Sequence, residues 1–466
     1  MASVLTRRFA EEEMNTVMQR RAFLQSVAIG SALSASAEPV DAMAAMSAVP
    51  LAANEHVTVY ESPDPTNVYA YSPGITRLPS GRLVATMDQG GKGVKELPGA
   101  VREGSSDVWR GKVYTSDDRG HTWTHRTDTP MVHARPFVAG ESLYVLGHSG
   151  KLCIVRSDDG GETWGDPSWL SDSGGWHQAP SNVAYARGRI YLVMEHNTKP
   201  SFKGWPVSVL APVVMAATVT ADLTKREAWT FSNELSFHDA VEQAGVPHLV
   251  GVPFHSPGLT APDSTGDKRS MALPGWLETN IVQFVDPNHV WNDPSGRTFH
   301  LWMRAHTGSV NLACIAKAVE AEDGSITVSL EQAPSGETML YVPCPGGQMK
   351  FHILYDDEMQ LFWLLSSQST DSMTQPSRLP ATRYNLPNNE RHRLVLHFSR
   401  NCVDWCFAAR VADSGSPNQG RHYASMVIDG DDLHVLSRSG DARAKNAHDG
   451  NLITFHTVRG FRRLVY

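Results

Sequence analysis

The chain lacks the features of a disulfide scaffold, a thiolate metal site or a nucleic-acid-binding protein. Its five cysteines are an odd number and form no C-x-x-C pair, so neither a disulfide framework nor a thiolate zinc site is indicated. We predict buried, free cysteines, with a bridge between Cys402 and Cys406 as the alternative. Lysine and arginine (41) are outnumbered by aspartate and glutamate (49). No long basic run is present, so nucleic acid is not expected as a partner.

Motifs of several common enzyme and binding classes are also missing. The sequence holds no H-E-x-x-H, EF-hand, P-loop or G-x-S-x-G pattern, so it gives no support for a zinc protease, a calcium sensor, a nucleotide-binding protein or a serine hydrolase. We expect no metal and no cofactor. Beyond the N-terminal region, no stretch is apolar enough to cross a membrane.

The N-terminal region has the pattern of an export signal. Residues 18–24 (MQRRAFL) resemble the twin-arginine motif, residues 27–33 form a short apolar run, and residues 35–37 (ASA) form a small-residue cleavage site. We predict a signal peptide over residues 1–37, a linker over residues 38–53 and a periplasmic or extracellular location in a bacterium. An uncleaved anchor or a cytosolic helix is the alternative.

One short phrase occurs twice. Residues 116–123 (SDDRGHTW) and 157–164 (SDDGGETW) both read S-x-D-x-G-x-T-W, and each follows an apolar β-type run. In such a turn, Asp and Ser bond backbone amides, Gly supplies a positive φ, and Trp fills the apolar gap between adjacent sheets. The two copies start about 41 residues apart, which is close to the length of one propeller blade.

The rest of the chain alternates short β-rich runs with clusters of Gly, Pro, Asp and Asn. Clear examples are residues 82–86, 143–146, 189–193, 300–303, 361–365 and 433–436. Repeated units of a turn followed by an apolar strand favour one radial array over two domains. We predict an all-β, six-bladed β-propeller over residues 54–466, with seven blades as the alternative. Residues 198–275 and 366–390 are predicted to be long insertions.

The repeated phrases resemble the Asp boxes, or BNR repeats, of the sialidase (neuraminidase) superfamily, whose members are β-propellers. In that family a tyrosine attacks the anomeric carbon and a glutamate takes its proton. An aspartate acts as acid and base, and three arginines hold the substrate carboxylate. The chemistry requires these groups because a phenol attacks only when a carboxylate polarises it, and the glycosidic oxygen leaves only when protonated.

Three residues match the catalytic positions that the resemblance implies. Tyr423, in the segment 421–430 (RHYASMVIDG), falls at the nucleophile, and Glu278, in 276–282 (WLETNIV), falls at its base. A carboxylate after two large apolar residues is costly unless it is paired or exposed in a cleft. Asp107, on a polar Gly-Ser-Ser loop, matches the acid/base. The structural alternatives are a half-buried strand tyrosine and a solvated loop aspartate.

Two of the three expected arginines have counterparts in the sequence. Arg304 closes a predicted strand, and either Arg391 or Arg393 matches another position. Guanidinium groups suit this task because they bind a carboxylate at two points and keep their charge. At the first position the family has Arg-Ile-Pro, whereas this chain has Tyr71 two residues before Pro73. The chain therefore resembles a divergent member that lacks the first arginine.

Further polar residues could line the site, namely His133, Arg135, His177 and His352. We predict a sialidase-like glycoside hydrolase that cleaves a terminal, acidic sugar from a glycan. One alternative is a polysaccharide lyase that acts on a uronate-containing glycan by β-elimination, with Tyr423 or a histidine as the base. The other is a non-catalytic carbohydrate-binding propeller, because one fold hosts many functions.

Overall fold

Antiparallel sheets that follow one another along the chain make up the fold. The computed structural model describes residues 49–98, 110–202, 205–244, 274–306, 311–379 and 388–466. The predicted signal peptide, most of the predicted linker and Asp107 lie outside these ranges. The residues from Leu51 to Tyr466 form one unit, and the description below concerns that unit.

The first three sheets occupy the N-terminal half of this unit. Blade one consists of β2 (Tyr69–Arg77), β3 (Leu83–Gly90), β4 (Arg110–Ser116) and β5 (Thr124–Thr129). Blade two consists of β6 (Val132–Ala139), β7 (Ser142–Ser149), β8 (Lys151–Ser157) and β9 (Ser168–Trp169). Blade three consists of β10 (Trp176–His177), β11 (Ala184–Ala186), β12 (Arg189–Asn197), β13 (Leu210–Thr218) and β14 (Thr230–Phe231).

Three further sheets follow. Blade four consists of β15 (Trp276–Val282), β16 (Thr298–Ala305), β17 (Leu312–Glu320), β18 (Ile326–Ser329) and β21 (Tyr341–Pro343), with the hairpin β19 (Glu331–Gln332) and β20 (Thr338–Met339) beside it. Blade five consists of β22 (His352–Asp356), β23 (Leu361–Ser367), β24 (Arg393–Ser399) and β25 (Cys406–Asp413). Blade six consists of β26 (Arg421–Asp429), β27 (Asp432–Ser439), β28 (Leu452–Val458) and β1 (Val57–Glu61).

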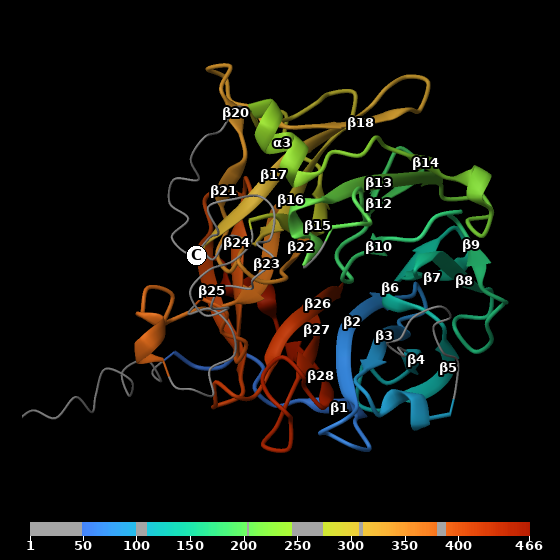
Figure 1. Ribbon diagram of the computed structural model, residues 1–466, viewed down its shortest axis with the longest axis vertical. Coiled ribbons are helices and arrows are strands. Elements are labelled where there is room, and N and C mark those ends of the chain that lie inside the picture. The colour runs from blue at the N-terminus through green and yellow to red at the C-terminus, as the bar shows by residue number, and fades with distance from the viewer. Residues whose placement is uncertain (1–48, 99–109, 203–204, 245–273, 307–310, 380–387) are drawn as a thin grey trace, which may run out of the picture. The chain divides into compact units, whose positions relative to one another are not determined.

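The ring closes because β1, from the N-terminal side, is the outer strand of the last blade. It pairs with β28 from Val57 opposite Phe455 to Glu61 opposite Leu452. Figure 1 shows the six sheets arranged around a centre, which the first strand of each blade faces. The prediction of a six-bladed, all-β propeller is therefore confirmed, and the seven-bladed alternative is wrong. Residues 51–53, assigned above to the linker, hydrogen-bond to β25.

Helical segments in the described residues are few and short. They are α3 (Phe237–Ala244) and the 3-10 turns η2 (Val94–Glu96), η3 (Pro206–Ser208), η4 (Arg226–Ala228), η5 (Pro376–Arg378) and η6 (Phe461–Leu464). None of the helices in this part of the chain is long and apolar enough to cross a membrane. All five cysteines are free, and every one except the half-buried Cys406 is buried, as predicted.

The predicted insertion over residues 198–275 is wrong in part. The described portion of it contains β13, which pairs with β12 along its whole length, and also β14 and α3. The prolines and histidines around β13 obscured a buried strand whose sequence, LAPVVMAAT, is almost wholly apolar. A continuous apolar run is expected where a strand is covered on both faces.

Each repeated phrase forms the same turn between the third and fourth strands of its blade. In the first copy, Gly120 N donates to Ser116 Oγ (2.8 Å), Ser116 Oγ donates to Asp118 Oδ1 (2.8 Å) and Thr122 N donates to the same oxygen (2.9 Å). Trp123 Nε1 donates to Gly120 O (3.1 Å). The second copy repeats these bonds at Ser157, Asp159, Gly161, Thr163 and Trp164.

The first turn joins blade one to blade six, which allows a test of its role in stability. Gly120 has φ 88°, and a Cβ there would lie 2.1 Å from Cε1 of Phe455. We expect Gly120→Ala to lower the free energy of unfolding by about 2–5 kcal/mol, from backbone strain and overpacking together. Gly415→Ala is the matched control, because Gly415 has φ 74° with no atom within 4 Å of a Cβ. Equal melting temperatures for the two variants would contradict this account.

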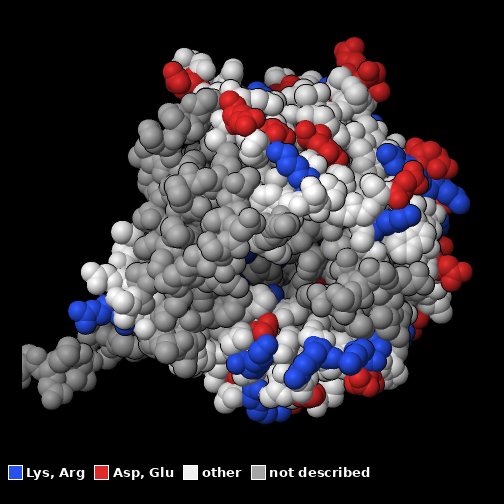
Figure 2. All heavy atoms as spheres, viewed as in Figure 1, with Lys and Arg blue, Asp and Glu red and all other residues white. Residues whose placement is uncertain are grey.

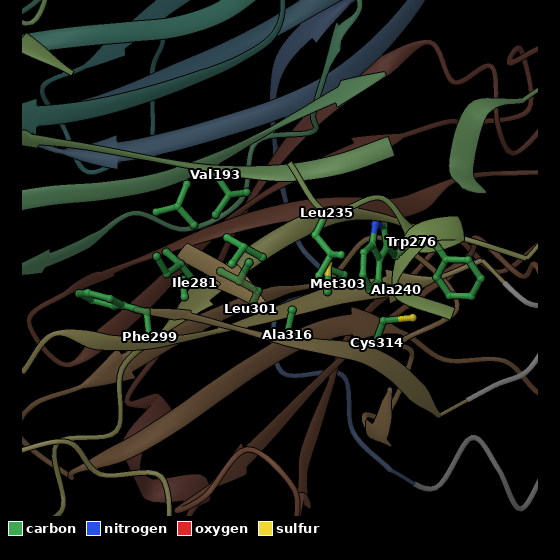
Figure 3. Close-up of a cluster of buried hydrophobic side chains, with 14 of the residues drawn as sticks. Val193, Leu235, Ala240, Trp276, Ile281, Phe299, Leu301, Met303, Cys314 and Ala316 are labelled. Atoms are coloured by element: carbon green, nitrogen blue, oxygen red, sulfur yellow. The ribbon is translucent and has the colours of Figure 1, made fainter. Parts of the chain in front are cut away.

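The largest buried cluster fills the space between blades three and four. Figure 3 shows Val193 of β12 facing Ile281 of β15 and Leu301 of β16, with Ala240 of α3 beside Trp276. Trp276 Nε1 also donates to a backbone oxygen of β13 at 2.8 Å. Burial of this apolar surface is the main favourable contribution to holding β15 in place. It fixes the strand from which Glu278 projects.

Candidate active site

Four inner strands carry the same irregularity near their first residues. The pairing register shifts in β2, β6, β15 and β26. At each shift a non-glycine residue has a positive φ: Ser72 (47°), His133 (55°), Glu278 (61°) and Tyr423 (52°). A bulge of this kind re-aims side chains, and the strained backbone costs about 1–3 kcal/mol per residue. Strain repeated at one end of four blades indicates a functional site there.

The repeated turns lie at the other end of the blades. In blade one, Tyr71 pairs with Asp88 and Asp88 with Gly111 at the bulged end, whereas Leu83 pairs with Ser116 at the opposite end. The S-x-D-x-G-x-T-W phrases therefore contribute to blade structure and not to the bulged end.

Tyr423, Glu278 and Arg304 are in direct contact, although they come from blades six and four. Tyr423 Oη donates a short hydrogen bond to Glu278 Oε1. Arg304 Nη1 donates to Tyr423 Oη (2.7 Å) and lies 3.3 Å from Glu278 Oε2. Glu278 and Arg304 are 2% and 5% exposed, while Tyr423 is half-buried. The sequence-predicted nucleophile and base thus lie together.

This environment keeps the phenol protonated at neutral pH. Burial raises the pKa of Tyr423 to about 12, and the carboxylate of Glu278 adds to the increase while the guanidinium of Arg304 opposes it. Burial also opposes the charge of Arg304, but Tyr423 and Glu278 outweigh it and raise the pKa of the guanidinium. Tyr423 can therefore act as a nucleophile only if its proton moves away during the attack, and Glu278 is the hydrogen-bonded acceptor.

Two more arginines flank the Tyr423 ring. The guanidinium carbons of Arg438, Arg391 and Arg304 lie 5.3, 5.7 and 6.0 Å from its centre. Arg391 and Arg438 are both buried. Arg438, on β27, was missed by the sequence analysis.

Arg393, the alternative to Arg391, does not contact this group. Its Nε lies 3.2 Å from Asp413 Oδ2, and its Nη1 donates to Thr370 Oγ1 (3.0 Å). β24 begins at Arg393, and Arg391 lies two residues before it. Of these two arginines, Arg391 is the one beside the Tyr423 ring.

Tyr71 occupies the position where the resemblance implies an arginine. Its hydroxyl donates to Asp449 Oδ1 (2.6 Å), and its ring lies 3.9 Å from the guanidinium carbon of Arg438. Burial is the main reason why the pKa of Tyr71 is raised well above its usual range. Tyr71 is thus a stacking partner that places Arg438 beside Tyr423.

Histidines of blades two and three form a second group, which includes His133 at the bulge of β6. His133 Nδ1 lies 3.0 Å from His148 Nε2, and the ring centre of His177 is 5.1 Å from that of His133. His177 Nδ1 lies 2.9 Å from the buried carboxylate of Glu195. His133 N donates to Asp88 Oδ1 (3.0 Å), and burial raises the pKa of Asp88 to about 7. The sequence analysis named only His133 and His177.

Arg135 and His352 do not join the Tyr423 group. Arg135 Nη2 donates to Ser181 Oγ (3.1 Å), and His352 Nδ1 accepts from Met426 N (2.8 Å). Both line a separate cavity. Their assignment as substrate-binding residues therefore stays a prediction.

A Tyr–Glu–Arg contact occurs a second time among the described residues. Tyr191 Oη donates to Glu320 Oε2 (2.5 Å), and Arg187 Nη2 donates to Tyr191 Oη (2.7 Å). Glu320 ends β17 at the side opposite Arg304, since Arg304 pairs with Ala313. Neither Tyr191 nor Glu320 has a positive φ. The bulges and the extra arginines distinguish the Tyr423 group.

One set of residues in the described part of the chain has a spacing suited to metal ligands: His238, Asp239 and Glu242 of α3. The Tyr423 group shares no residue with this set.

Comparisons with known proteins support the fold. No protein-family model and no curated protein matches the sequence. A solved mutant of Trypanosoma rangeli sialidase displaying trans-sialidase activity aligns with 89% of this chain and 60% of that chain, at 12% identity and a TM-score of 0.50. The Hadza microbial sialidase Hz136 aligns with 87% of this chain and 68% of that chain, at 14% identity and a TM-score of 0.49. A Penicillium chrysogenum α-L-arabinanase complexed with arabinobiose aligns with 88% of this chain and 98% of that chain, at 12% identity and a TM-score of 0.44.

The T. rangeli alignment shows a shared fold, and 12% identity shows nothing further. The chain has a sialidase-like β-propeller fold.

Proposed function

We propose that the protein is an exported, sialidase-like glycoside hydrolase that removes a terminal, acidic sugar from a glycan. The contact between Tyr423, Glu278 and Arg304 carries this proposal. A tyrosine bonded to a buried carboxylate is the arrangement needed for a phenolic nucleophile, and glycosidases with a tyrosine nucleophile are sialidases. The propeller shared with a solved sialidase supports it.

In the first step, Tyr423 Oη attacks the anomeric carbon while its proton passes to Glu278 Oε1. The bond from that carbon to the leaving oxygen breaks, and an acid supplies the proton that the leaving oxygen needs; we assign this role to Asp107 on the resemblance. Water then attacks the same carbon and gives its proton to Asp107, now the base, while the bond to Tyr423 breaks and Tyr423 Oη takes its proton back from Glu278. Arg304 stabilises the negative charge that develops on the phenol oxygen, because its Nη1 already donates to that atom (2.7 Å).

Three arginines support the proposal of an acidic sugar. Arg304, Arg391 and Arg438 surround the Tyr423 ring, and Glu278 is the carboxylate in contact with it. The net charge of the chain is −8, and Figure 2 shows Asp and Glu mainly over the upper part of the visible face, Lys and Arg mainly along its lower edge, and both signs together at the right. Attraction for an anion must therefore come from the buried arginines, each worth about 1.5–3 kcal/mol in a charge-assisted pair.

The test is a digest of glycans that end in sialic acid, hexuronic acid or neutral arabinose, followed by mass and near-ultraviolet analysis of the products. We expect release of an acidic monosaccharide with the mass of added water and no new absorbance. An absorbing, unsaturated product would show β-elimination instead. Binding without any product would indicate a carbohydrate-binding propeller. Release of arabinose alone would retain the hydrolase and contradict the acidic substrate.

A further inference from the structure

A cavity lies beyond the Tyr423 group along the inner strands. It has a volume of about 170 Å³ and is lined mainly by β2, β6, β22, β26 and residues 180–185. Its lining begins at Ser425 on β26, two residues past Tyr423, and at Gly74 on β2, three residues past Tyr71. At about 3.3 Å per residue, the cavity lies roughly 7–10 Å further along the strands. None of Tyr423, Glu278 and Arg304 lines it.

Two deeply buried side chains in the cavity wall have donor atoms with no partner among the described residues. Arg135 is 2% exposed, and its Nη2 donates to Ser181 Oγ (3.1 Å) and Val193 O (3.0 Å). Its Nε and Nη1 have no hydrogen-bond acceptor among the described residues. His352 is 4% exposed, and its Nδ1 accepts a hydrogen bond from Met426 N (2.8 Å). Its Nε2 has no hydrogen-bond partner among the described residues. A neutral imidazole that accepts at Nδ1 carries its hydrogen on Nε2.

His352 is neutral in this environment. Burial keeps its pKa well below the usual range, and the neighbouring charges of Lys350 and Arg135 lower it further. Its free Nε2 is therefore a donor. Together with Nε and Nη1 of Arg135, the unpartnered groups are all N–H donors.

Ser425 and Asn182, two other polar residues of the wall, already have partners within the protein. Ser425 Oγ donates to backbone oxygens at 2.8 and 3.1 Å and lies 3.0 Å from the ammonium of Lys350. Asn182 bonds both the N–H and the C=O of Ile281 (2.8 and 2.7 Å). Since a buried donor without an acceptor is costly, these donors require an acceptor from outside the chain.

The electrostatics of this layer favour a negative occupant. Arg135 carries a positive charge at neutral pH, and Lys350, whose pKa burial lowers to about 7, carries part of one. Burial lowers the pKa of Arg135 to about 10, and the buried carboxylate of Glu195 opposes this decrease. Glu195 Oε1 already accepts two hydrogen bonds, from N and Oγ1 of Thr279, both at 3.0 Å. It also pairs with His177.

We propose that this cavity binds a small carboxylate, with its oxygens on Arg135 and His352 and a short apolar chain toward the opening. Apolar side chains line the rest of the wall: Ile75, Phe137, Val183, Leu354, Met426 and Val427. The volume of about 170 Å³ far exceeds what one water needs, about 10–15 Å³, and is below the 300–1,000 Å³ typical of pockets for drug-sized ligands. Nε and Nη1 lie on different edges of the guanidinium, so one carboxylate oxygen would accept from one of them and the other oxygen from Nε2 of His352.

The test is calorimetric titration of the full chain with butyrate, and with 1-butanol and chloride as probes that lack the charge or the chain. We expect butyrate to bind, 1-butanol to show no heat, and chloride to bind at least tenfold more weakly. Arg135→Met, which keeps the length and removes the guanidinium, is expected to weaken butyrate at least tenfold. Val427→Phe, which narrows the cavity and leaves Arg135 in place, tests the same site if Arg135→Met does not fold.

The matched control is Arg391→Met, because the Tyr423 group is also expected to bind carboxylates. Loss of butyrate binding in Arg135→Met but not in Arg391→Met supports the cavity site, whether or not the proposed hydrolase activity is found. Loss in Arg391→Met alone would place butyrate at the Tyr423 group and overturn the proposal. Absence of binding to the folded wild type, or chloride binding as tight as butyrate, would also overturn it.

Discussion

Replacing Tyr423 by phenylalanine is expected to lower kcat by at least about a thousandfold while the propeller still folds. The substitution removes the attacking oxygen and keeps the ring, so the reaction loses its covalent step. Arg304 Nη1 and Glu278 Oε1 each lose a hydrogen-bond partner, but they remain 3.4 Å apart and can pair with each other. We expect a loss of stability of about 1–3 kcal/mol. Turnover on the glycan identified above and the melting temperature measure the two effects.

Tyr191→Phe is the control for this prediction. It also removes a phenol that is bonded to a glutamate and an arginine, Glu320 and Arg187, and burial raises the pKa of Tyr191 to about 12 as well. We expect a similar loss of stability and unchanged kcat. If Tyr423→Phe kept full turnover, Tyr423 would be excluded from the reaction. If both variants lost turnover in proportion to their stability, the Tyr423 contact would be structural.

The blades were predictable because local patterns encode them. The two S-x-D-x-G-x-T-W phrases place a turn between the third and fourth strands of blades one and two, and their bonds lie within eight consecutive residues. The apolar strands that follow turn residues supply the rest. Tyr423, Glu278 and Arg304 were found because each lies in a short segment that resembles a family pattern. Their chemical roles remain proposals, and Asp107 lies outside the described residues.

What the sequence could not reveal depends on ring closure and on pairing across blades. Arg438 stands on the second strand of blade six and stacks on Tyr71 of blade one, a contact between residues far apart in the chain. Asp88 lies on the second strand of blade one and binds the backbone of His133 in blade two. Arg135 has the same residue type as the arginines around Tyr423, and its position past the bulge of β6 places it on the wall of the cavity.

Glu278→Gln is expected to lower kcat by about 10²–10⁴-fold, because the amide can accept the Tyr423 hydrogen bond but cannot take the proton. Its effect on stability is a separate question. Glu278 is the carboxylate paired with Arg304 and also raises the pKa of Lys350 against burial. Removing one partner of a buried ion pair costs about 3–5 kcal/mol. Turnover must therefore be expressed per folded molecule, with the folded fraction taken from circular dichroism.

Two further variants separate the proton acceptor from the structural charge. Glu278→Asp keeps the charge and shortens the side chain by one methylene, so we expect most of the stability to return while kcat stays at least tenfold low. Glu320→Gln removes the matched carboxylate, which pairs with Arg187 and Arg189; we expect it to lose stability and keep kcat. Full turnover in folded Glu278→Gln would exclude Glu278 as the base. A kcat that follows the melting temperature across all three variants would show that the charge of Glu278 holds the arginines in place and does no more.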